Sequence, residues 1–245
     1  MRFFIHYRLV TILILALMVS QNSFGFNLKP VIYLIPGQGS DYRLFKNLQI
    51  DSTFEVRNIS YCIPDENMTL PEFARELSIQ IDTLRPYLLI GVSLGGMIAT
   101  EMGEFMNPEK IILISSAKCR DELPRRYKFQ HGLPIYKIVS GKTAKRGAKL
   151  LQPIVEPDRK NEKETFINML NDKEPDFLKR TLKMIFEWER VDYPSDIIHI
   201  HGDKDSTIPI RNVNYDYVIK GGSHMMVLTR STEISELIND ILTKN

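Results

Sequence analysis

YLLIGVSLGG, residues 87–96, is the stretch that most constrains the fold of this 245-residue chain. It opens with four apolar residues that indicate a short buried strand, and it leads into a stretch with helical spacing. Gly91 and Gly95 flank Ser93 two positions before and two positions after it. A serine at a sharp strand-to-helix turn has a strained backbone and tolerates only small neighbours at these positions. The segment therefore predicts a serine presented between a strand and a helix.

The same alternation of apolar runs and helical stretches continues on both sides of this segment. It is typical of an α/β fold with a mostly parallel sheet flanked by helices. With 43% hydrophobic and 25% charged residues, the chain has the composition of one sizeable globular domain. Strands are predicted at 31–34, 54–59, 87–91, 110–115, 196–201 and 215–220, and helices at 70–84, 96–106 and 231–242.

The strand and helix alternation stops between residues 118 and 192. This interval has helical spacing, few strand signals and repeated Pro and Gly breaks, so several short helices are expected. We interpret residues 118–192 as a helical cap inserted into a core of residues 26–117 and 193–245. Residues 118–149 hold ten Lys or Arg and two acidic residues. A solvated surface explains this charge, and so does contact with an anionic substrate, an anionic carrier or a membrane surface.

Residues 1–25 are predicted to be a secretory signal peptide. Arg2 and Arg8 precede an apolar run over residues 9–20, and small polar residues follow it. The run is shorter than the ~20 residues that span a bilayer, so export to the periplasm or exterior is favoured over an amino-terminal membrane anchor. Removing this segment brings the formal charge from +2 to zero, and no general attraction to nucleic acid is then expected.

Four segments of the chain together resemble enzymes of the α/β-hydrolase fold that carry a helical cap. They are PGQGSD at 36–41, GVSLGG at 91–96, HGDKDSTIP at 201–209 and GGSH at 221–224. The resemblance covers nearly everything after residue 30 and implies a serine hydrolase without a metal or organic cofactor. It leaves the substrate open, because the superfamily includes esterases, thioesterases, lipases, amidases, perhydrolases and C–C bond hydrolases. Ser93 stands where dehalogenases and epoxide hydrolases have aspartate, which argues against both.

This resemblance implies a catalytic triad in the chain order serine, acid, histidine. Ser93 is the expected nucleophile, and His224 is the one histidine that lies late enough and in a loop. The other four, in the predicted signal, in the cap and in or at the end of a strand, are His6, His131, His199 and His201. Asp203 and Asp205 both qualify as the acid, and likeness to a G-x-x-D-x-x-x-P segment favours Asp205, with Asp203 as a turn residue.

Two backbone amides are expected to bind the negative charge that develops on a substrate carbonyl. The resemblance implies the amide of Leu94, directly after the nucleophile, and that of Gln38, in the loop after the first strand. Pro36 stands where many relatives have histidine. This departure changes the side-chain support of the loop and leaves the backbone donor in place, while an ordinary turn is the alternative interpretation of the loop.

The expected reaction is hydrolysis of a carboxylic ester or thioester through an acyl-enzyme, with the acyl chain in an apolar pocket under the cap. Candidate pocket residues are Phe129, Leu133, Ile135, Tyr136, Ile138 and Met169. Two alternatives remain open: another hydrolytic activity of the fold, such as that of a lipase, amidase or C–C bond hydrolase, and a non-catalytic binding protein that keeps the fold.

The sequence predicts neither a disulfide nor a metal site. Cys62 and Cys119 end predicted strands that two others separate, which puts them ~14 Å apart, whereas bridged Cα atoms lie within ~7 Å. His201, Asp203 and Asp205 are metal-ligand types, but all three lie at one strand end without a second cluster.

Overall fold

The computed structural model describes residues 28–129, 140–156 and 159–244. The predicted signal peptide therefore lies outside the described residues. Six strands form one sheet in the order β2-β1-β3-β4-β5-β6, and every neighbouring pair is parallel, as the alternation predicted. The strands are β1 (Val31–Ile35), β2 (Glu55–Asn58), β3 (Tyr87–Val92), β4 (Lys110–Ile114), β5 (Ile197–Gly202) and β6 (Tyr217–Ile219).

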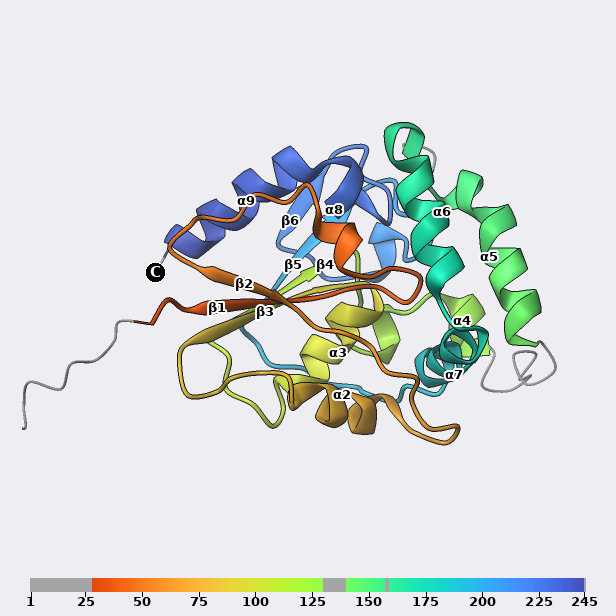
Figure 1. The fold of residues 1–245 in the computed structure, drawn as a ribbon, viewed down its shortest axis with the longest axis horizontal. Helices are drawn as coiled ribbons and strands as arrows, with labels where there is room; N and C mark the ends of the chain where they lie inside the picture. The colour runs from red at the N-terminus through yellow and green to blue at the C-terminus, as the bar shows by residue number, and fades with distance from the viewer. Residues whose placement is uncertain (1–27, 130–139, 157–158, 245) are drawn as a thin grey trace, which may run out of the picture.

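Helices cover both faces of this sheet (Figure 1). Helices α2 (Leu70–Ser78) and α3 (Leu94–Met102) pack on one face, and α8 (Met226–Thr229) and α9 (Ser231–Thr243) lie on the other. The central strands β1 and β3 are buried along their whole length, which explains why their sequences are continuous apolar runs rather than alternating ones. Helix α2 begins at a capping box between Thr69 and Glu72, with Pro71 in its first turn.

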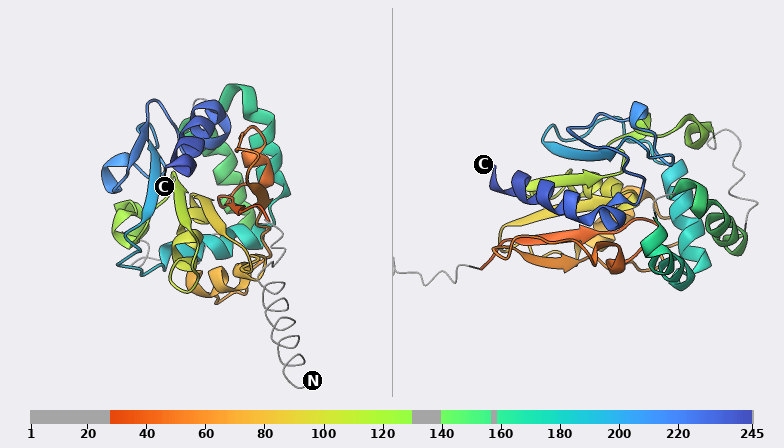
Figure 2. Two further views of the ribbon diagram at one scale, coloured as in Figure 1. Left: turned by 90° about the vertical axis from the view of Figure 1, so that its left-hand side faces the viewer. Right: turned by 90° about the horizontal axis from the view of Figure 1, so that it is seen from above.

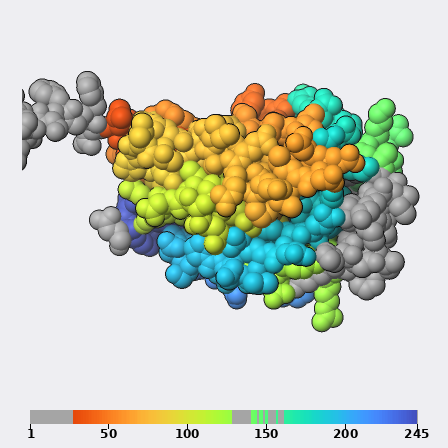
Figure 3. Space-filling view, turned by 90° about the horizontal axis from the view of Figure 1, so that it is seen from below, coloured from red at the N-terminus to blue at the C-terminus, as the bar shows by residue number. Residues whose placement is uncertain are grey.

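Four of the described helices follow β4 and precede β5 in the sequence, and they lie at the carboxyl ends of the strands (Figures 1 and 2). They are α4 (Arg125–Phe129), α5 (Gly141–Val155), α6 (Lys163–Asp172) and α7 (Pro175–Phe186). This is the inserted helical cap that the sequence predicted; its limits at residues 118 and 192 stay a prediction. Figure 3 shows from below that α7, in cyan, adjoins the segment around α2, in yellow to orange. Across the described ranges, the helices are too short or too polar to cross a membrane.

Short 3-10 segments connect these elements: η1 (Tyr42–Phe45), η2 (Arg120–Glu122), η4 (Arg159–Glu162) and η5 (Ile210–Asn212). The two edge strands, β2 and β6, are shorter than predicted, and short edge strands are common in natural sheets. Cys62 and Cys119 are both free, and β1 and β3 separate the strands that precede them, as expected.

The helix predicted at 70–84 ends six residues early, at Ser78. The carboxylate of Asp82 accepts a hydrogen bond from the backbone N–H of Leu84 at 3.0 Å. The backbone N–H of Asp82 donates to the hydroxyl of Tyr33, on β1, at 2.8 Å. These local and tertiary hydrogen bonds replace the helical ones, which the sequence spacing alone did not reveal.

Candidate active site

Ser93 lies in a tight turn between the last residue of β3 and the first residue of α3. Its φ and ψ angles are 53° and −119°, a conformation that non-glycine residues rarely adopt. A Cβ on Gly91 would lie 2.3 Å from the carbonyl oxygen of Gly95, and a Cβ on Gly95 would lie 2.1 Å from that of Ile35. The glycine at each of these positions is therefore a steric requirement of the turn.

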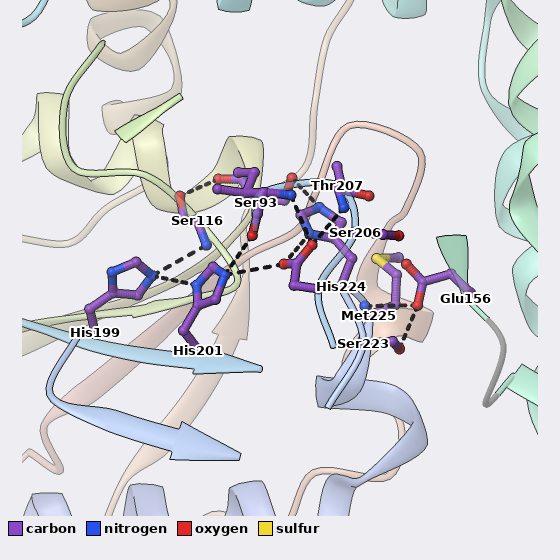
Figure 4. A network of polar contacts seen from close by, with 12 residues as sticks. Ser93, Ser116, Glu156, His199, His201, Ser206, Thr207, Ser223, His224 and Met225 are labelled. Carbon is purple, nitrogen blue, oxygen red and sulfur yellow. Dashed lines mark hydrogen bonds and ion pairs between the residues drawn. The ribbon is translucent and has the colours of Figure 1, made fainter. Parts of the chain in front are cut away.

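Ser93, His224 and Asp205 form one hydrogen-bonded line. His224 Nδ1 lies 2.7 Å from Asp205 Oδ2, and His224 Nε2 lies 2.9 Å from Ser93 Oγ (Figure 4 labels the serine and the histidine). An ionised carboxylate only accepts, so Nδ1–H donates to it and Nε2 is left to accept from the serine hydroxyl. Burial alone lowers the pKa of His224, but the charge and hydrogen bond of Asp205, with a smaller effect of Glu156, hold that pKa above its ordinary value.

The structure separates the two candidate acids. Asp205 is 5% exposed, and its second oxygen, Oδ1, accepts the backbone N–H groups of Thr207 and Ile208, each at 2.8 Å. Asp203 instead accepts the backbone N–H of Gly221 at 2.6 Å, at an exposed turn. Asp205 therefore lies beside the histidine, and Asp203 does not.

Leu94 directly follows Ser93, and the loop that carries Gln38 lies against the same turn. The amide of Leu94 opens helix α3, where backbone N–H groups have no acceptor within the helix. The loop that carries Gln38 packs against the turn, since a Cβ on the preceding residue, Gly37, would lie 3.4 Å from the Cβ of Ser93. The hydroxyl of Tyr61 donates to the carbonyl oxygen of Pro36, so this loop is supported through its backbone at the position where histidine is common.

The side chain of Gln38 connects this loop to the cap. Its Nε2 donates to the carbonyl oxygen of Leu178 and to Oγ1 of Thr181, both on α7 and both at 2.9 Å. The loop after β1 and the Ser93 turn after β3 meet where the strand order reverses, since β2 lies beyond β1 and β4 beyond β3. The crevice at such a switch point is the usual ligand site of open α/β sheets.

A cavity of about 230 Å³ opens on Ser93 and His224 between the core and the cap. Its apolar lining includes Met97, Leu123, Phe166, Leu170, Leu178 and Ile185. The prediction that Met169 lines the pocket is wrong, because this side chain is fully buried in the apolar cluster on the α9 side of the sheet. The other predicted lining residues, Leu133, Ile135, Tyr136 and Ile138 and the side chain of Phe129, lie outside the described part of the chain.

Behind the turn lies a buried polar network that sequence analysis missed (Figure 4). Ser116 Oγ donates to the carbonyl oxygen of Ser93 at 2.7 Å, and the backbone N–H of Ser116 lies 3.4 Å from His199 Nε2. His199 Nε2 lies 3.1 Å from His201 Nδ1, and His201 Nε2–H donates to the carbonyl oxygen of Ile208 at 2.8 Å. Burial lowers the pKa of both imidazoles.

These two imidazoles therefore belong to a structural hydrogen-bond network in which His201 also faces Asp205. His201 Nε2 lies 3.4 Å from Asp205 Oδ2. Across the described ranges, no three His, Cys, Asp or Glu side chains are grouped so that they could hold a metal ion.

Sequence analysis also missed Glu156, which follows α5 in the cap. Its carboxylate is 3% exposed and lines the same cavity as Ser93. Its Oε2 accepts from Ser223 Oγ at 2.7 Å and from the backbone N–H of Met225 at 3.1 Å (Figure 4). Burial raises the pKa of this carboxyl to about 7. No motif surrounds Glu156, so only its position in space could reveal it.

A hydroxyl, an imidazole and a carboxylate in this order can pass a proton from oxygen to nitrogen and stabilise the resulting imidazolium. The amides of Leu94 and Gln38 belong to segments that adjoin Ser93, and their binding of a developing oxyanion stays a prediction. The apolar cavity beside them can hold an uncharged group. The arrangement therefore suits nucleophilic attack by a serine.

Comparisons with protein-family models and with curated proteins give no match to this sequence. Solved structures do match. An enol-lactonase from Burkholderia xenovorans LB400 has a TM-score of 0.70 and 13% identity, over 90% of this chain and 94% of that one. A thermophilic esterase from Thermogutta terrifontis has a TM-score of 0.69 and 17% identity, over 88% and 90% of the two chains. A hydrolase from Oleispira antarctica has a TM-score of 0.67 and 17% identity, over 89% and 93%. With its parallel sheet, strained serine turn and inserted helices, the chain has the α/β-hydrolase fold.

Proposed function

We propose that the protein is a serine hydrolase that cleaves a carboxylic ester or a thioester. The observation that carries this proposal is the line of hydrogen bonds from Ser93 through His224 to Asp205, which opens on an apolar cavity. An esterase and an enol-lactonase among the solved structures of similar fold support the ester class.

In the proposed mechanism, Ser93 Oγ attacks the acyl carbonyl carbon while its proton moves to His224 Nε2. The amides of Leu94 and Gln38 bind the oxyanion, and Asp205 stabilises the imidazolium. His224 then returns the proton to the departing alcohol or thiol. A water molecule releases the acid from the acyl-enzyme by the same steps and restores the Ser93 hydroxyl.

The cavity has room for a short acyl group. Its volume of about 230 Å³ is moderately larger than the ~150 Å³ of an engineered cavity that binds benzene. We therefore expect esters of short aliphatic or single-ring acids to be better substrates than long-chain esters.

A fluorophosphonate probe tests the nucleophile directly, because it reacts with activated serines. We expect labelling of the purified protein at Ser93 and none in the Ser93→Ala variant. The variant should also lose hydrolysis by about three orders of magnitude or more. Folded wild-type protein without labelling would favour the non-catalytic binding protein.

A substrate panel then separates the hydrolytic alternatives. p-Nitrophenyl esters of increasing chain length, acyl thioesters, anilides and triglyceride emulsions would be compared by kcat/KM. The highest values are expected for short-chain esters or thioesters. A preference for anilides would indicate an amidase, and one for emulsions would indicate a lipase.

We also propose that the protein is exported and that a signal peptidase cleaves it after residue 25. The n-, h- and c-region pattern of residues 1–25 supports this proposal. Amino-terminal sequencing of protein recovered from the cell exterior or periplasm should find Phe26 first. A full-length chain recovered with membranes would support the anchored alternative.

For the basic first part of the cap we propose contact with an anionic membrane surface, with an acidic carrier as the alternative. Lys142, Arg146 and Lys149 are exposed on α5 and lie on one side of it, since their spacing is four and three residues. Cosedimentation with anionic vesicles, and its loss when all three are changed to Gln, would support the proposal. Equal binding to neutral vesicles would contradict it.

A further inference from the structure

One ionisable side chain of the cap reaches the loop that carries His224. Glu156 follows the carboxyl end of α5, far in sequence from residues 221–225, yet its Oε2 accepts hydrogen bonds from both neighbours of the histidine. Ser223 donates through its hydroxyl at 2.7 Å, and Met225 donates through its backbone N–H at 3.1 Å. A single carboxylate oxygen thus holds the loop immediately before and immediately after the imidazole.

Glu156 is not an exposed surface carboxylate that happens to touch this loop. Glu156 is 3% exposed, and moving a carboxylate out of water costs free energy unless its environment compensates. The two hydrogen bonds and the nearby imidazole supply part of that compensation, yet burial still dominates and brings the pKa of the carboxyl to about 7. A carboxyl placed at this cost beside a reactive histidine is a candidate for a role in the site's chemistry.

The charges around His224 come from several elements. Asp205 and His201 face it from the end of β5, Arg126 acts from α4, and Glu156 acts from the end of α5. Asp205 and Glu156 both favour the imidazolium, whereas Arg126 disfavours it. Two carboxylates therefore raise the pKa of His224, and the guanidinium of Arg126 lowers it.

We propose that Glu156 is a positioning residue that ties the cap to the His224 loop and, as a second carboxylate, stabilises the imidazolium form of His224. Its catalytic consequence rests on the proposed hydrolase function. Ser93 Oγ–H gives its proton to His224 Nε2 during attack, and an ionised Glu156 lowers the free energy of the resulting cation. The cap thereby acts on the proton acceptor as well as on the substrate.

Glu156→Gln separates charge from shape. The amide oxygen of Gln still accepts from Ser223 and Met225, but the side chain carries no charge. Glu156→Ala removes both features. Glu164→Gln is the matched control, because Glu164 is an exposed carboxylate on the cap helix α6. Folding of each variant is checked by circular dichroism and thermal unfolding.

Two measurements on the whole chain test the proposal. The first is an NMR titration of the His224 ring, assigned by comparison with His224→Gln. Glu156→Gln should lower the pKa of His224 by about 0.5 to 1 unit, in keeping with the loss of one neighbouring opposite charge. The second is the pH dependence of kcat/KM for an ester, whose acidic limb should move to lower pH by a similar amount. Glu164→Gln should change neither.

An unchanged His224 pKa in folded Glu156→Gln would overturn the proposal, because a structural clamp would leave the titration in place. The NMR titration needs no activity, so it decides the proposal even if the hydrolase assignment fails. That assignment fails separately, if Ser93→Ala keeps full hydrolytic activity or if the wild type resists fluorophosphonate.

Discussion

Replacing Glu156 with Gln should make the folded protein more stable at pH 8 than the wild type, with a difference that fades toward pH 5. The folded-state pKa of Glu156 is about 7, against 4.5 for the unperturbed carboxyl. Below pH 4.5 the carboxyl is protonated in both the folded and the unfolded state. Between these values only the folded state binds the proton, so wild-type stability falls as pH rises through this window.

The size of the effect follows from the same shift. A difference of 2.5 units at 1.36 kcal/mol per unit corresponds to about 3 kcal/mol in the free energy of unfolding. Screening by solvent takes little from this value, because the side chain is 3% exposed. Gln does not ionise, so the variant lacks this loss of stability. The raised pKa of His224 also makes stability fall as pH rises in both proteins. The lower His224 pKa expected in Glu156→Gln makes that fall smaller in the variant, so it acts in the same direction as the loss of the Glu156 titration.

Urea denaturation at pH 5, 6, 7 and 8 measures this difference directly, with equal m-values as the condition for comparing the two proteins. The free energy of unfolding of the variant, minus that of the wild type, should increase by about 2.5 kcal/mol from pH 5 to pH 8, because part of the effect is already present at pH 5. Glu164→Gln should show a pH-independent difference. A constant difference for Glu156→Gln over this range would refute the reasoning, because it would mean that Glu156 titrates normally.

Three further outcomes test other parts of the site. Asp205→Asn should lower kcat by about four orders of magnitude, because the correct histidine tautomer is lost. Asp203→Asn should keep kcat within about twofold of wild type. If a p-nitrophenyl ester assay gave the reverse order, Asp203 would be the acid. Gly95→Ala should cost at least about 2 kcal/mol in urea denaturation, because its Cβ would lie 2.1 Å from the carbonyl oxygen of Ile35. Gln38→Ala should keep the backbone donor but lose two hydrogen bonds to α7 worth about 1 kcal/mol each. We therefore expect kcat/KM to fall. Unchanged kinetics would show that these bonds do not position the loop.

Within the described residues, the cap contacts the core site at points that lie far apart in the sequence. Gln38 bonds to α7, Arg126 of α4 donates to the backbone carbonyl of Ser206 at 3.1 Å, and Glu156 bonds on both sides of His224. Each contact reaches a different loop of the site. If the proposed function holds, a shift of the cap would change the oxyanion loop, the acid loop and the histidine loop together.

Local sequence was sufficient for the parts of this protein that depend on near neighbours. Continuous apolar runs predicted the buried parallel strands, because such strands meet helices on both faces. The glycines around Ser93 predicted a sharp turn, because the backbone there leaves no room for a Cβ. The predicted ends of elements were less accurate. Helix α2 ends at Ser78, and within the predicted helix Asp82 instead bonds to Tyr33, 49 positions away in the sequence.

What the sequence by itself determined, then, is the α/β architecture, the turn at Ser93 and a short set of partners for it. Asp203 and Asp205 follow the same strand, and likeness to a G-x-x-D-x-x-x-P segment favoured Asp205 without fixing where either side chain points. Only the tertiary structure shows that Asp205 bonds to His224 and Asp203 to the backbone of Gly221. It alone also brought Glu156 to the site, because burial and a partner 69 residues away leave no local signal in the sequence.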